Sequence, residues 1–145
     1  MTHPPEPLRS LERLVDVRER EVDRLTADMA DKRALRDRFL RSIERMEHLA
    51  HSSGASGGTL LAQALNRGAY KQAMLHLAHT HRQDLGRHEA DLAQAQQQLT
   101  QAVRRKEVLG QVLEQRQQVQ ALAAQALQQK RDDELASQVW WRGQA

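Results

Sequence analysis

Histidines are the residues whose type and spacing come nearest to a chemical site in this chain. Six of them form two groups: His48 and His51, then His76, His79, His81 and His88. Imidazole is a common zinc ligand, and two histidines three residues apart on a helix could contact one metal ion. No carboxylate or cysteine beside them completes a recognised spacing such as H-E-x-x-H. We therefore interpret them as histidines exposed on helices, and we predict no metal site and no cofactor.

The rest of the sequence offers no catalytic pattern either. It contains no glycine-rich phosphate loop and no nucleophile motif. The absence of cysteine excludes disulfides and thiolate chemistry. We therefore expect a protein that binds other proteins and is not an enzyme.

The composition indicates long helices rather than a globular core. The chain has one Phe, one Tyr and two Trp, although aromatic side chains bury the most area each. Hydrophobic residues make up 39% and charged residues 28% of the chain. This balance is typical of helices that carry narrow apolar stripes.

Charge and hydropathy bear on location and partners. Residues 1–7 have neither the basic nor the apolar region of a signal peptide, and no run approaches the roughly 18 apolar residues of a membrane span. We therefore expect a cytoplasmic protein.

The net charge is +3, but residues 1–50 interleave 11 Lys and Arg with 11 Asp and Glu, as on the solvated face of a coiled coil. We therefore expect no binding to nucleic acid.

The apolar pattern predicts an all-α fold, a long two-helix antiparallel coiled-coil hairpin. Residues 1–7 hold all three prolines and are predicted to be disordered, and residues 8–145 to form a single coiled-coil domain. The first helix is predicted over residues 8–51, with apolar steps averaging close to 3.5 residues and a local stammer between Met29 and Leu35. Its stripe comprises Leu8, Leu11, Val15, Val22, Leu25, Met29, Leu35, Phe39, Ile43, Met46 and Ala50.

A glycine- and serine-rich break at residues 52–58 predicts the hairpin tip. The second helix is predicted over residues 59–141. Alanines in its seam, Ala95 and Ala102 among them, suggest a close approach of the first helix. Because the helices differ in length, the first is expected to cover the second only to about residue 105. The uncovered apolar residues of this C-terminal overhang would be Leu109, Val112, Leu113, Val119, Leu122, Ala126 and Leu127.

Three features allow two interpretations each. Tyr70, Met74, Leu77 and His81 form a stripe that is offset from a main seam through Lys71, Leu75, Ala78, Arg82 and Leu85, and it is either an interface or packing beneath the tip. Trp140 and Trp141 are either a partner anchor or an unconstrained tail. The thirteen glutamines in residues 94–129 are either a solvated face or an uncharged surface suited to a partner's channel.

Several segments resemble the FliJ family, the coiled-coil proteins of the flagellar type III export apparatus. The resemblance runs in order through nearly the whole chain. Its segments are Pro7-Leu8-Arg9-Ser10-Leu11-Glu12-Arg13-Leu14, Leu65-Asn66-Arg67-Gly68-Ala69-Tyr70, Arg105-Lys106-Glu107-Val108-Leu109, and Gln129-Lys130-Arg131-Asp132-Asp133-Glu134-Leu135.

The resemblance implies a stalk and adaptor in protein export. Its partners would be the export ATPase hexamer, the membrane export gate and export chaperones, and they would hold the protein peripherally at the inner face of the cell membrane. The gate-side face would comprise Phe39, Ile43, Met46, Tyr70, Met74, Leu77 and His81. The ATPase-side end would comprise Leu109, Leu113, Val119, Leu122, Trp140 and Trp141. The alternatives are the stalk of a virulence type III secretion system and an unrelated structural coiled coil.

Overall fold

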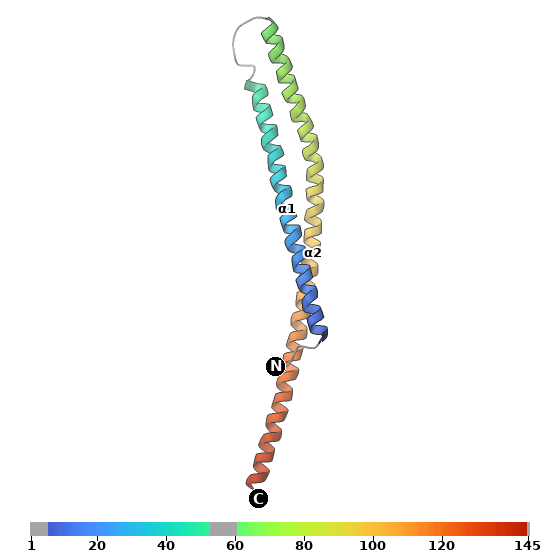
Figure 1. Cartoon of the computed structure of the whole chain (residues 1–145), viewed down its shortest axis with the longest axis vertical. Coiled ribbons are helices and arrows are strands. Elements are labelled where there is room, and N and C mark those ends of the chain that lie inside the picture. The colour runs from blue at the N-terminus through green and yellow to red at the C-terminus, as the bar shows by residue number, and fades with distance from the viewer. Residues whose placement is uncertain (1–5, 53–60, 145) are drawn as a thin grey trace. The chain divides into compact units, whose positions relative to one another are not determined.

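The fold consists of two long helices. The computed structural model of the chain describes residues 6–52 and 61–144, and all of these except Gln144 are helical. Helices α1 (Glu6–Ser52) and α2 (Leu61–Gly143) pack against each other, and no strand occurs among the described residues (Figure 1). The predicted all-α class and helical hairpin are confirmed.

The helix boundaries differ from the predicted ones by about two residues. Helix α1 begins at Glu6 and includes Pro7 in its first turn, where the missing N–H costs no helical hydrogen bond. The Ser10 hydroxyl donates a hydrogen bond to the Pro7 carbonyl over 2.9 Å. Ser52 ends α1, and the rest of the predicted tip lies outside the described residues. Helix α2 continues two residues past the predicted end, to Gly143.

The chain divides into two compact units, which are described separately. The inner unit comprises Asp23–Gln101, and the terminal unit comprises Met1–Val22 with Ala102–Ala145. Each unit contains one part of α1 and one part of α2.

In the inner unit, the α1 side of the helix interface follows an unbroken alternation of three- and four-residue steps. Leu35 is exposed, and the seam instead passes from Met29 through Lys32 and Arg36. The predicted stammer is therefore wrong, because the aliphatic stems of Lys and Arg occupy seam positions while their charged ends reach water. The buried and half-buried seam residues are Leu25, Met29, Lys32, Arg36, Phe39, Ile43, Met46 and Ala50.

The α2 side of this interface follows the same alternation. Leu75 and Arg82, which were predicted for the main seam, are exposed, and Arg82 forms an ion pair with Glu47. The predicted seam is correct at Ala78 and Leu85 and is wrong at Leu75, Arg82 and Lys71, which is also exposed. Its observed members are Met74, Ala78, His81, Leu85, His88, Leu92, Ala95 and Leu99.

Polar pairs across the interface fix the antiparallel direction within the inner unit. Arg36 Nε lies 3.2 Å from Glu89 Oε1, and Arg33 donates to Gln96 over 3.3 Å. Ala95 is buried in this unit, and Ala102 is buried in the terminal unit, which agrees with the small seam residues expected where helices approach closely.

The terminal unit repeats this packing. Leu109 and Leu113 of α2 are half-buried, and Leu8 of α1 is buried. Lys106 donates to Glu19 over 3.0 Å, and Gln117 donates to Glu12 over 3.5 Å. Helix α1 therefore covers α2 well beyond residue 105, and the predicted start of the overhang is wrong.

The reason for this longer cover lies in the pairing register. The predicted end of the cover at about residue 105 assumes that the first residue of α2 already pairs with α1. In the inner unit, however, the α2 seam begins only near Met74, and the turns before it lie beyond the last buried residue of α1, Ala50. Each α1 residue therefore faces an α2 residue that lies further along the chain than the predicted pairing placed it.

Candidate partner-binding surfaces

The α1 residues of the predicted gate-side face lie in the helix interface of the inner unit. Ile43 is buried, with 7% of its surface exposed, and Phe39 and Met46 are half-buried. These three side chains mainly hold α1 against α2. A partner that contacts this face would reach only the edges of Phe39 and Met46.

The α2 residues of the same predicted face divide into two pairs. Met74 and His81 are half-buried in the seam. Tyr70 and Leu77 flank the seam, with 44% and 40% of their surfaces exposed. The structure therefore leaves Tyr70 and Leu77 as the accessible apolar members of this stripe.

Two further leucines are exposed near the start of α2, on a different side of the helix from Tyr70 and Leu77. Leu61 and Leu65 are among the most exposed apolar residues of the inner unit, and neither was included in the predicted face. The sequence signal was the apolar turn that contains them just after the glycine-rich break. A shallow groove on this part of α2 is lined by Gln63, Asn66, Arg67 and Tyr70.

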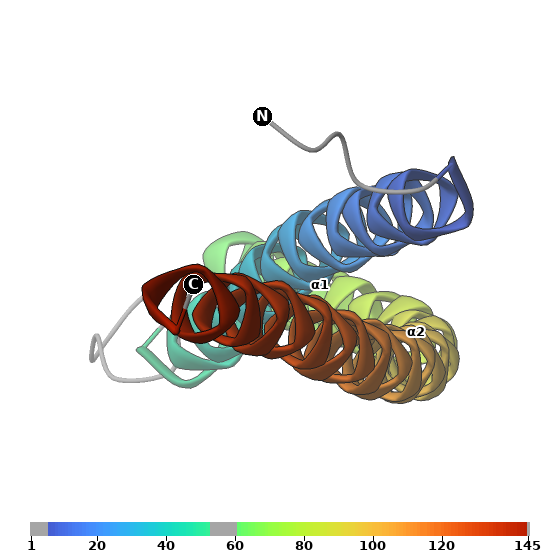
Figure 2. The same ribbon diagram turned by 90° about the horizontal axis from the view of Figure 1, so that it is seen from below.

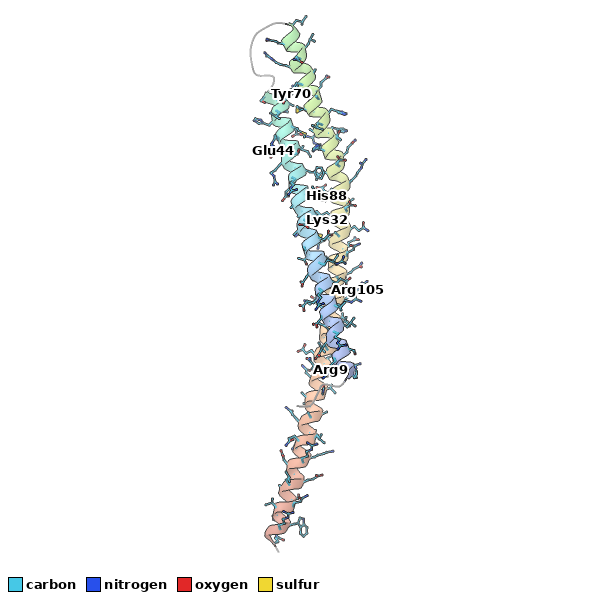
Figure 3. All side chains as sticks on the ribbon, viewed as in Figure 1. Arg9, Lys32, Glu44, Tyr70, His88 and Arg105 are labelled. Atoms are coloured by element: carbon cyan, nitrogen blue, oxygen red, sulfur yellow. The ribbon has the colours of Figure 1, made fainter. Side chains whose placement is uncertain are left out.

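A polar layer crosses the seam of the inner unit, where Figure 3 labels Lys32 and His88 on the two helices. His88 Nε2 donates a hydrogen bond to the Lys32 carbonyl oxygen over 2.7 Å. The Phe39 ring lies 6.0 Å from the rings of both His88 and His81, edge-on to His81. His81 and His88 are therefore packing residues of the seam rather than exposed histidines as predicted.

Within the described residues, the histidines of this layer are not grouped with further metal-ligating side chains. Among residues 6–52 and 61–144, no three His, Asp or Glu side chains are placed to hold one metal ion. The buried Nδ1 of His81 has no hydrogen-bond partner in this described part of the chain. The layer contributes packing and helix register.

The predicted ATPase-side residues fall into two groups within the terminal unit. Leu109 and Leu113 are half-buried against α1. Val119 is exposed, and it lies at the end of the α1 cover, in a groove that it forms with Ala123, Pro7 and Leu8. This groove marks the end of the intramolecular packing in the terminal unit.

Past the α1 cover, α2 continues as a single helix to Gly143 (Figures 1 and 2). Every described side chain from Ala121 to Arg142 is exposed. The exposed surface of Leu122 is 65%, and that of Trp141 is 68%. The rings of Trp140 and Trp141 form an edge-to-face pair with centroids 5.4 Å apart. From Gln117 to Gln129 the sequence contains no charged residue. This exposed end of α2 is a candidate docking element. Tertiary packing supplies most helical stability, so a partner that covered the helix would stabilise it.

Comparison with known proteins decides the family. The family model described as "Flagellar FliJ protein" matches residues 8–145. This chain belongs to the FliJ family. The searches of curated proteins and of solved structures found no match to the chain.

Membership of the FliJ family makes this chain a flagellar protein related to export, a role in which the family is a non-catalytic component. Within the described residues, neither helix contains a stretch that is long and apolar enough to cross a membrane. The start of α2 and its C-terminal end are two exposed apolar regions of the described residues.

Proposed function

We propose that this FliJ-family chain is a stalk and adaptor of flagellar export, and that the exposed end of α2 docks on the export ATPase hexamer. The observation that carries the proposal is the run of exposed apolar side chains beyond the α1 cover in the terminal unit, including Leu122 and Trp141. A helix without intramolecular packing gains stability when a partner covers it.

The uncharged character of this segment favours a docking role. Residues 117–129 offer glutamine, alanine, leucine and valine to a partner. Burying these groups requires no compensation of a charge, whereas a buried unpaired charge is costly. Such a helix therefore suits the interior of a ring-shaped partner.

We further propose that the start of α2 contacts the membrane export gate and export chaperones. Its support is the exposure of Tyr70 and Leu77 on one side of α2 and of Leu61 and Leu65 on another side, in the first turns of the helix. Tyrosine and other large apolar side chains are favoured anchors of protein interfaces. Attachment to the membrane would then be peripheral and through partners.

The ATPase contact is tested with Leu122→Asp in a titration against the purified export ATPase. Leu122 is exposed, so the substitution leaves the hairpin folded, and loss of an interface anchor should weaken binding by roughly 30-fold. Gln125→Asp is the matched control, because it adds the same charge to the same exposed segment without removing an apolar side chain. Equal binding by both variants and the unchanged protein would contradict the proposal.

A further inference from the structure

The exposed end of α2 also carries a regular spacing of side chains. Docking of this helix on the ATPase would not require such a spacing. Ala123, Ala126, Lys130, Asp133, Ser137 and Trp140 follow one another at steps of three and four residues. This alternation is the coiled-coil period, so these side chains share one stripe of the helix. All of them are exposed in the terminal unit.

The residues of this stripe are ordered so that two copies of it, running in opposite directions, can pair with each other. Its centre holds a lysine and an aspartate, Lys130 and Asp133. On one side of this centre lie the small residues Ala123 and Ala126, and on the other side lie Ser137 and Trp140. A second helix of the same sequence that runs antiparallel would therefore meet opposite charges at the centre and a large residue over a small one towards the ends.

The register follows from these pairs. In such an antiparallel pair Lys130 would face the partner's Asp133, and its own Asp133 would face the partner's Lys130, so a two-fold axis would relate two ion pairs. In the same register Trp140 would lie over the partner's Ala123, and Ser137 would lie over the partner's Ala126. A parallel arrangement would set each charge against its like, which disfavours it. The antiparallel contact is isologous and closes as a dimer.

The charges needed for this contact are available. In the described part of the chain, none of Lys130, Arg131, Asp133 and Glu134 forms an ion pair. Asp132 accepts a hydrogen bond from Gln128 over 3.0 Å, on the side of the helix away from the stripe. Leu122, Leu127 and Trp141 flank the stripe, are exposed, and would lose solvent contact on pairing.

We propose that residues 120–143 of α2 pair with the same segment of a second copy of this chain as an antiparallel two-helix coiled coil. The proposal does not depend on docking to the ATPase. Where both occur, one segment serves both contacts, so the dimer and the ATPase complex exclude each other. Self-pairing then covers the apolar end of α2 in the free protein until a partner replaces the second copy.

The test is charge exchange in the full chain, followed by sedimentation equilibrium over a range of concentrations. The unchanged protein should show a monomer–dimer equilibrium. Lys130→Asp alone and Asp133→Lys alone should each weaken the dimer by roughly ten-fold or more, because both ion pairs become repulsive. An equimolar mixture of the two variants should form a heterodimer of restored affinity. Pairing of Lys130 with Asp133 inside one helix would not produce this heterodimer.

A crosslinking measurement fixes the direction of pairing, and the chain lacks cysteines that would interfere. Ala126→Cys mixed with Ser137→Cys should give a disulfide-linked heterodimer. Either variant alone should remain uncrosslinked, because identical positions then lie about 16 Å apart along the helices at 1.5 Å per residue. A protein that stays monomeric up to millimolar concentration, a dimer indifferent to both charge reversals, or crosslinking of Ala126→Cys with itself would overturn the proposal.

Discussion

His88 of α2 donates a hydrogen bond from Nε2 to the backbone carbonyl oxygen of Lys32 in α1, over 2.7 Å. A backbone acceptor cannot change position without a shift of its helix, so this bond ties one turn of α2 to one turn of α1 in the inner unit. The Phe39 ring beside His88 fills the adjacent seam position. The layer thus combines a register-specific bond with apolar packing.

Replacing His88 with alanine should lower the free energy of unfolding by about 1–2 kcal/mol. The variant loses one net hydrogen bond and part of the packing on Phe39. His79→Ala is the control, because His79 is exposed on the same helix. Urea unfolding followed by circular dichroism measures both variants, and equal effects would show that the contact between His88 and Lys32 contributes nothing to stability.

Arg36 gives a second prediction about the seam. Its position faces Glu89, with side-chain exposures of 42% and 47%, so the ion pair contributes less than about 1 kcal/mol. Arg36→Leu should raise the melting temperature, because a leucine fills the seam better than a half-exposed arginine. Arg36→Glu should lower it, because two carboxylates then face each other. Arg38→Leu, at an exposed position, should leave it nearly unchanged.

The helices and most of the residues in the seam could be predicted from the sequence. The placement of all prolines before Leu8 and the long interval without glycine predict α1, and the leucine and alanine spacing predicts the seam from Leu85 onwards. The seam positions of Arg36 and His88 were missed, because a hydropathy pattern does not register the apolar stem and the ring face that these residues bury.

The extent of the overhang was missed for a different reason. Heptad spacing fixes which face of a helix is buried, but it does not fix which heptad of α1 meets which heptad of α2. That offset follows from the pairing of Glu47 with Arg82 in the inner unit. Gln117 and Glu12 provide the matching observation in the terminal unit. The sequence therefore identified the exposed end of α2 but placed its start too early.

Hydrogen exchange in dilute solution checks the corrected boundary. Amides from Leu85 to Ala102 should exchange slowly, and those around Leu109 and Leu113 should also be protected by the α1 cover. Amides from Ala124 to Gly143 should exchange fast, because an unpacked helix frays. Fast exchange beginning near residue 105 would contradict the α1 cover of the terminal unit.

Leu113 and Leu122 should respond differently to the same substitution. Leu113→Asp places a carboxylate in the half-buried seam against α1 and should destabilise the terminal unit by about 2 kcal/mol. Leu122→Asp changes an exposed side chain and should alter stability by less than about 0.5 kcal/mol. Thermal unfolding of the two variants provides the comparison, and equal destabilisation would mean that Leu122 is packed in the free protein.

The start of α2 is tested by removing its exposed anchors together. Tyr70→Ala combined with Leu77→Ala should leave the melting temperature nearly unchanged, because both side chains are exposed at the edge of the seam. Binding to the cytoplasmic part of the export gate should weaken by roughly 30-fold or more, as expected for interface anchors.

Two controls separate the surface from the core in this experiment. Lys71→Ala changes an exposed neighbour of Tyr70 and should affect neither binding nor stability. Ile43→Ala removes a buried side chain and should destabilise the hairpin by about 2 kcal/mol or more. A double variant that loses stability like Ile43→Ala while binding the gate normally would show that Tyr70 and Leu77 support the fold, and that the gate contacts another part of the chain.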